Sequence, residues 1–133
     1  MVDYVKVLRE QGVQAVQLVD VSGAYSQAVP AVVFKPLNAI GIGTEATIWT
    51  PAAGKKFRLM GGIVSIGTAV GNVSIKDNTA GTTILVIPKT TLDTAIALPM
   101  MGNGILSATA GNVLTATGTA LATISGFVFG TEE

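Results

Sequence analysis

The chain has 133 residues, which is the usual size of one domain and long enough to bury a core. Charged residues make up only 12% of it, eight basic and eight acidic, so the net charge is zero and no nucleic-acid-binding surface is expected. Cysteine and histidine are both absent, which excludes disulfides, thiolate chemistry and the commonest general base and metal ligand.

The first 40 residues are expected to form an N-terminal arm with short strands. Residues 3–10 fit a short helix and a short strand equally well, whereas residues 13–20 alternate as a strand does. Another strand is predicted at 29–35, where Pro30 favours a sheet edge, and Pro36 to Gly43 is predicted to be a loop. The arm contains no apolar signal-peptide core, so synthesis in the cytoplasm is expected.

Residues 41–133 are predicted to form the folded domain, because turn residues recur about every ten positions, as in sandwiches and barrels. Gly61 and Gly62 lie in the middle of one predicted strand and indicate a β-bulge or a sharp bend. A hairpin loop is predicted at 77–81. The first strands of the domain are expected at 46–50, 57–66, 73–76 and 82–87.

Residues 94–131 carry no charge, and this stretch is long enough to span a bilayer. Glycine, asparagine and threonine interrupt it every few residues, so we expect strands instead of a membrane helix. They are predicted at 94–98, 104–109, 113–117 and 121–129, with tight turns at 110–112 and 118–119 joining consecutive strands as pairs. With roughly eight to ten strands, the prediction is an all-β, single-domain antiparallel β-sandwich, jelly-roll-like, with a barrel as the alternative.

The chain offers few candidates for catalysis. Glycines 41 and 43 begin like a dinucleotide-binding loop, but the third glycine and a following helix are missing. Acidic residues in turns ordinarily shape those turns, and every candidate carboxylate lies in or beside one. These carboxylates are Asp20, Glu45, Asp77 and Asp93. We therefore expect no enzyme activity, no cofactor and no metal site.

Two further features have a structural and a functional interpretation. Trp49, the single tryptophan, is expected in the core, and a platform for stacking a sugar is the alternative. Lys55, Lys56 and Arg58 form the longest basic cluster, which a solvated strand start explains more simply than a nucleic-acid-binding surface.

Small and apolar residues occupy both faces of the C-terminal strands. A monomer would expose them as a large apolar patch, which is unusual without a partner. We therefore expect self-association through strands between residues 94 and 129. The candidate contact residues are Thr115, Thr117, Thr123 and Phe127.

Three segments resemble small β-rich structural proteins of tailed bacteriophages. They are Ile48–Gly62, where TPAAGKK opens a strand, Gly71–Asp77, and Ala110–Leu114, where AGN closes a late hairpin. The resemblance covers residues 44–130. It implies a jelly-roll-like sandwich, a homotrimer, attachment to a capsid or a place in a tail, and no catalytic residue.

On this resemblance the chain is expected to be a capsid decoration (cement) protein. It would bind the major capsid protein on the outside of the virion shell and stabilise it, with neither nucleic acid nor membrane as a partner. The arm is expected to contact the shell through Val13, Val16, Leu18, Val32 and Phe34. One alternative is a head-fibre, tail or baseplate module that binds a host glycan or receptor. Another is a cellular carbohydrate-binding accessory domain.

Overall fold

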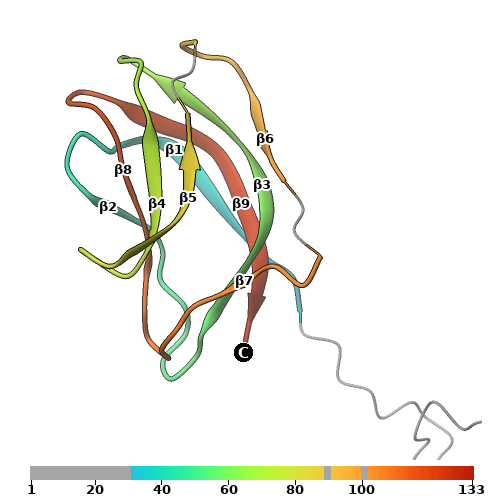
Figure 1. Ribbon diagram of the computed structural model, residues 1–133. Coiled ribbons are helices and arrows are strands. Elements are labelled where there is room, and N and C mark those ends of the chain that lie inside the picture. Colours follow the sequence, from blue (N-terminus) through green and yellow to red (C-terminus); the bar gives the residue numbers. More distant parts are fainter. Residues whose placement is uncertain (1–30, 89–90, 100–101) are drawn as a thin grey trace, which may run out of the picture.

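The computed structural model describes residues 31–88, 91–99 and 102–133. Within these ranges the chain forms nine strands and no helix, and the strands make two antiparallel sheets. Figure 1 shows these layers, with the long strands β3 (Phe57–Gly67) and β9 (Thr123–Glu132) side by side in one of them. The prediction of an all-β antiparallel sandwich is confirmed.

The larger sheet has five strands. Its order is β1 (Val33–Gly41), β9, β3 and β6 (Ile96–Leu98). The two-residue strand β7 (Ile105–Leu106) also pairs with β3, beside its first residues. The edges of this sheet are therefore β1 on one side and the short strands β6 and β7 on the other.

The smaller sheet has four strands. Its order is β2 (Ala46–Trp49), β8 (Leu114–Thr117), β4 (Val73–Asp77) and β5 (Thr82–Ile87). Predicted strands at 46–50, 73–76 and 82–87 match three of these strands to within a residue at each end.

The strand pairs are nested. With the short β7 set aside, β1 pairs with β9, β2 with β8, β3 with β6, and β4 with β5. Among the described strands, only β4 and β5 are both consecutive in the chain and paired with each other. Most of the fold therefore depends on contacts between residues far apart in the sequence.

The core lies between the two sheets, where alternate residues of each strand point inward. On β4, for example, Val73 and Ile75 are buried while Ser74 and Lys76 are only half-buried. The largest fully buried side chains are Trp49, Phe57, Leu37, Ile42, Leu59, Ile66, Ile75, Leu114, Ile124, Val64, Val73 and Val128.

The predicted loop at Pro36–Gly43 is wrong over most of its length, because β1 continues through Pro36 to Gly41. A strand at the edge of a sheet needs hydrogen bonds on one side only, so a residue without an N–H group is tolerated there. Pro36 lies opposite Phe127 of β9, and a register shift follows between Leu37 and Ile40. The sandwich thus begins at β1, before the boundary predicted at residue 41.

The turns at 110–112 and 118–119 do not close hairpins. The first leads from β7, which pairs with β3, to β8, which pairs with β2 and β4. The second leads from β8 to β9 in the opposite sheet. A tight turn signal reports a local change of direction, and here that change carries the chain from one layer to the other.

Two local predictions are confirmed. The pairing of β3 with β9 shifts register between Leu59 and Gly61, where the two glycines predicted a bulge. The hairpin loop at 77–81 joins β4 to β5, with Asn78 and Ala80 at positive φ.

Candidate functional site

Three phenylalanine rings gather on the outside of the five-stranded sheet. Antiparallel pairing places Phe34 of β1 opposite Phe129 of β9, and Phe127 lies two residues further along β9 on the same face. The ring centroid of Phe34 lies 6.1 Å from that of Phe127 and 5.7 Å from that of Phe129. Phe34 remains 63% exposed, which is unusual for a large aromatic side chain.

The apolar surface continues across the sheet. Phe127 lies opposite Ile63 of β3, which is 45% exposed, and Ile63 lies opposite Ala97 of β6. None of these residues is charged. We name this surface the apolar face, and it consists of Phe34, Pro36, Ile63, Ala97, Phe127 and Phe129, with the buried Gly61 opposite Phe129.

The outer face of the four-stranded sheet carries several polar groups. Lys76 and Ser74 alternate with the core residues of β4 and therefore point outward. Strand pairing places Thr115 of β8 opposite Lys76 and opposite Thr47 of β2. The aromatic rings thus gather on one side of the sandwich, whereas Lys76 and Ser74 lie on the other, which also exposes Val86 opposite Ser74.

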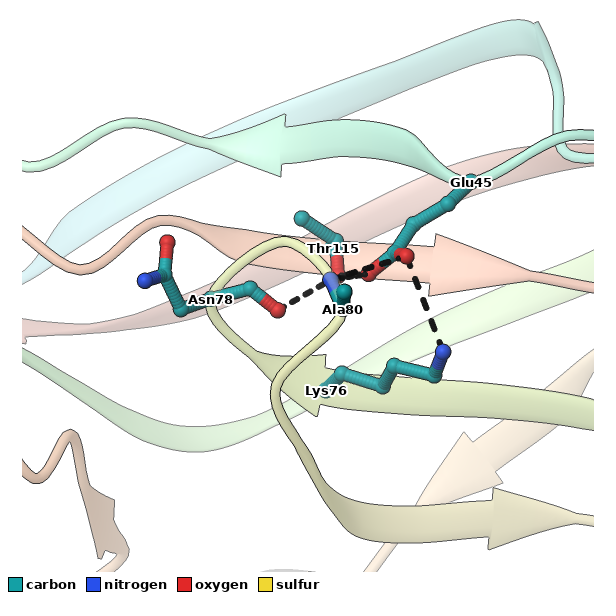
Figure 2. A network of polar contacts seen from close by, with 5 residues as sticks. All are labelled: Glu45, Lys76, Asn78, Ala80 and Thr115. Carbon is teal, nitrogen blue, oxygen red and sulfur yellow. Dashed lines mark hydrogen bonds and ion pairs between the residues drawn. The ribbon is translucent and has the colours of Figure 1, made fainter.

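A hydrogen-bond network around Glu45 organises this polar side. Figure 2 shows the carboxylate of Glu45 beside Thr115 and the turn between β4 and β5. It accepts hydrogen bonds from the Thr115 hydroxyl at 2.6 Å and from the Ala80 amide at 3.0 Å, and lies 3.6 Å from the Lys76 ammonium group. The Thr115 hydroxyl also lies 3.4 Å from the carbonyl of Asn78.

These contacts lower the pKa of Glu45. The Thr115 hydrogen bond is the largest cause, the Ala80 amide is the second, and partial desolvation opposes both. Ala80 has a positive φ of 54°, so the carboxylate holds a turn whose backbone is otherwise unfavourable for alanine. The network therefore positions the β4–β5 turn against β8.

Asp77 has a similar structural role. It is 8% exposed, and its carboxylate accepts hydrogen bonds from the Ala108 amide at 2.7 Å and the Asn112 side chain at 2.9 Å. Asp93 lies in a turn at positive φ, and its amide donates a hydrogen bond to the carbonyl of Ile66 in β3. Asp20 lies outside the described residues. Among residues 31–88, 91–99 and 102–133, no group of three acidic side chains could hold a metal ion.

The basic cluster is engaged with the chain itself. The Arg58 guanidinium pairs with both carboxylate oxygens of Glu133 and donates to the carbonyl of Asn103 at 2.7 Å. The Lys56 ammonium group donates to the carbonyl of Ala108 at 2.8 Å. The cluster was interpreted as a solvated strand start. Two of its three cations, Lys56 and Arg58, also form hydrogen bonds to other segments of the chain.

Trp49 lies in the core, as predicted. It is 1% exposed, and its ring centroid lies 5.8 Å from that of Phe57. A buried ring cannot stack on a sugar, so Trp49 provides no glycan platform. A shallow depression elsewhere, beside the exposed Leu121 and Gly43, is lined only by small or apolar uncharged residues and one threonine.

The four predicted self-association residues do not form one surface. Phe127 belongs to the apolar face, whereas Thr117 lies half-buried in the opposite sheet. Thr123 is half-buried at the start of β9, with its hydroxyl 3.3 Å from that of Thr68. The prediction of Thr115 as a self-association contact is corrected. Its side chain is 1% exposed and donates a hydrogen bond to Glu45, so it presents nothing to a second copy.

Two of the predicted shell-contact residues are exposed and lie two positions apart in the chain. Val32 is 53% exposed and Phe34 is 63% exposed. Val13, Val16 and Leu18 lie outside the described residues. The structure thus brings Phe34, a predicted shell contact, against Phe127, a predicted self-association contact.

Sequence reasoning missed Phe129, Ile63 and Pro36 as members of the apolar face. Phe129 had a local signal, because it follows Phe127 at the spacing of one strand face. Ile63 and Pro36 had none, since they join the face only through the pairing of β3 and β1 with β9.

Comparison with protein-family models, with curated proteins and with solved structures finds no match to this chain. The part of the chain that the structure describes contains no helix long and apolar enough to cross a membrane.

Proposed function

We propose that the chain is a virion structural protein that binds the outside of a phage capsid as an oligomer and stabilises the shell. The virion setting rests on the sequence resemblance within residues 44–130. The binding role rests on one observation, the uncharged apolar face with Phe34 63% exposed and Ile63 45% exposed. Its partners in this proposal are its own copies and the major capsid protein.

An apolar surface of this kind favours association. Contiguous exposed apolar patches on soluble proteins mark interaction sites, and aromatic side chains supply much of the binding energy in interfaces. Where many copies bind one shell, weak contacts add to a firm attachment because each copy holds its neighbours close.

The nested strand order supports the virion setting. A jelly roll has eight strands in two sheets, and the eight longer strands here pair in the nested manner of that fold. Jelly rolls occur in viral capsid proteins and in lectins. Fold alone does not assign function, so the strand order adds to the resemblance and does not replace it.

The proposal includes no catalytic role. Glu45 and Asp77 both accept hydrogen bonds from the chain's own amides and side chains, which supports a structural use of these carboxylates. Shell contact by the arm residues Val13, Val16 and Leu18 remains part of the proposal, as does contact by Val32 beside the apolar face.

The location of the protein on the particle is the first test. An antibody against the purified chain is applied to virions of the phage that encodes it, followed by gold labelling and electron microscopy. Labels distributed over the capsid are expected. Labels confined to the tail, baseplate or fibres would assign the alternative role, and unlabelled particles would contradict the virion proposal.

A second test measures stabilisation. Particles produced without this protein are heated with and without added protein, and release of DNA is followed by dye fluorescence. The proposal predicts a higher release temperature after addition of the wild-type chain. An unchanged release temperature, with protein bound to the capsids, would contradict the stabilising role.

A further inference from the structure

We infer that a second copy of this chain covers the apolar face, in a dimer formed by two such faces. This inference shares the apolar face with the proposed function but not its virion setting, so a failure of the dimer and a failure of the virion role give different results. The contact would go beyond shell binding, because it exists in solution before any capsid is present.

Aromatic side chains are distributed unevenly over the face. Its β1 and β9 half carries the three phenylalanine rings, whereas its β3 and β6 half carries only Ile63 and Ala97 at the surface, since Gly61 is buried. A half-turn about an axis that lies in the plane of contact and runs along the strands lays the aromatic half of one copy over the half of the other copy that carries no ring. A surface that is complementary to itself in this way is what a two-fold contact requires.

Charge does not oppose contact between two such faces. No member of the apolar face is charged, and the whole chain has a formal net charge of zero, so two copies approach without net repulsion. Anionic partners such as nucleic acid would find no cation on this face to hold them. The opposite side carries the charged groups of Glu45 and Lys76, which favour contact with water.

The apolar face resembles the surfaces that the chain already packs between its two sheets. Two sheets pack face to face about 10 Å apart, with apolar side chains interdigitated. The rings of Phe34, Phe127 and Phe129 lie with centroids 5.7 to 6.4 Å apart, as in packed aromatic clusters. The resemblance to phage proteins implies a homotrimer, whereas the self-complementary face predicts a dimer.

The test is the mass of the full-length chain in solution, by light scattering after size exclusion over a wide concentration range. The wild-type chain is expected at twice the 13.5 kDa of one copy. Ile63→Lys places a charge in the middle of the face, where it would be buried without a partner, and is expected to weaken dimerisation about 30-fold or more. Phe34→Ser is the second variant and removes the most exposed ring.

Val86→Lys is the matched control. Val86 lies on β5 of the opposite sheet and is 49% exposed, close to the 45% of Ile63. Circular dichroism and thermal unfolding confirm that all three variants are folded. A dimer that Ile63→Lys and Phe34→Ser dissociate, and that Val86→Lys leaves intact, supports the inference.

Three outcomes would overturn it: a wild-type monomer at every concentration, a wild-type trimer, or a dimer that survives both variants of the face. A monomer would leave the face to residues 1–30 or to the shell. If the dimer forms as expected but capsids carry no label, the virion proposal fails and this inference stands.

Discussion

The indole Nε1–H of Trp49 donates a hydrogen bond of 2.9 Å to Oε1 of Glu132, although the two residues lie 83 positions apart in the sequence. Trp49 ends β2 in the four-stranded sheet, and Glu132 ends β9 in the five-stranded sheet. The other carboxylate oxygen, Oε2, accepts the Ala52 amide at 3.0 Å. One carboxylate thus joins the two layers at this end of the sandwich and satisfies a buried indole.

Glu132→Gln is expected to destabilise the fold by about 1–3 kcal/mol. An amide has one acceptor oxygen where the carboxylate has two, so the Trp49 and Ala52 donors cannot both be satisfied equally well. The loss of charge also weakens whichever hydrogen bond remains. Urea denaturation at neutral pH measures the change.

Glu133→Gln is the control for this variant. Glu133 neighbours Glu132 but lies exposed, where it pairs with Arg58, and exposed ion pairs contribute little. A smaller loss of stability is expected. Equal losses in the two variants would show that the link between Trp49 and Glu132 has no special weight.

The same carboxylate predicts how stability depends on pH. The Trp49 hydrogen bond is the largest cause that lowers the pKa of Glu132 below its ordinary value of 4.5, and Glu45 and Glu133 are lowered as well. A group with a lower pKa in the folded state stabilises the fold above its unfolded pKa, and this contribution is lost as pH falls through the folded pKa. Stability is therefore expected to drop below about pH 4.5.

Urea denaturation over a series of pH values tests this dependence. The difference between wild type and Glu132→Gln should be largest at neutral pH and should shrink in acid, because both chains are then neutral at this position. A difference that stays constant down to the lowest pH would contradict the assigned cause.

The sequence predicted local structure well wherever one strand carried its own signal. Alternation on β4 and the glycine pair in β3 were sufficient for a strand and a bulge. The burial of Trp49 was also predictable, because an isolated tryptophan within a strand packs best in a core.

The candidate site was predicted only in part, because it is created by strand pairing. Phe34 and Phe127 each appeared as candidates, but for different roles, and nothing local indicated that β1 and β9 would bring them together. The prediction that Thr115 is a self-association contact failed for the same reason, since its hydrogen-bond partner Glu45 lies 70 positions earlier in the sequence. The loop predicted to begin at Pro36 was wrong, because a proline is tolerated in a strand at the edge of a sheet.

Gly62→Ala is expected to disrupt the centre of the larger sheet. A Cβ atom at this position would lie 2.3 Å from the carbonyl oxygen of Phe127, and backbone in a paired strand cannot move away easily. A loss of about 3 kcal/mol is expected, measured by thermal and urea unfolding. Gly41→Ala, with no atom within 4 Å of the added carbon, should be tolerated, and equal losses would contradict the clash.

Thr115→Val tests the network that holds the β4–β5 turn. Valine keeps the shape of the side chain but removes the hydroxyl that donates to Glu45 at 2.6 Å. Because this hydrogen bond is the largest cause of the lowered pKa of Glu45, the pKa should rise toward 4.5 in the variant. NMR titration of the Glu45 carboxyl carbon measures this pKa. Hydrogen exchange of the Ala80 amide, which also donates to this carboxylate, should become faster.

Thr117→Val, two residues along the same strand, is the control and should change neither the Glu45 pKa nor the exchange rate of the Ala80 amide. An unchanged Glu45 pKa in Thr115→Val would mean that Ala80 and Lys76 hold the carboxylate without the hydroxyl.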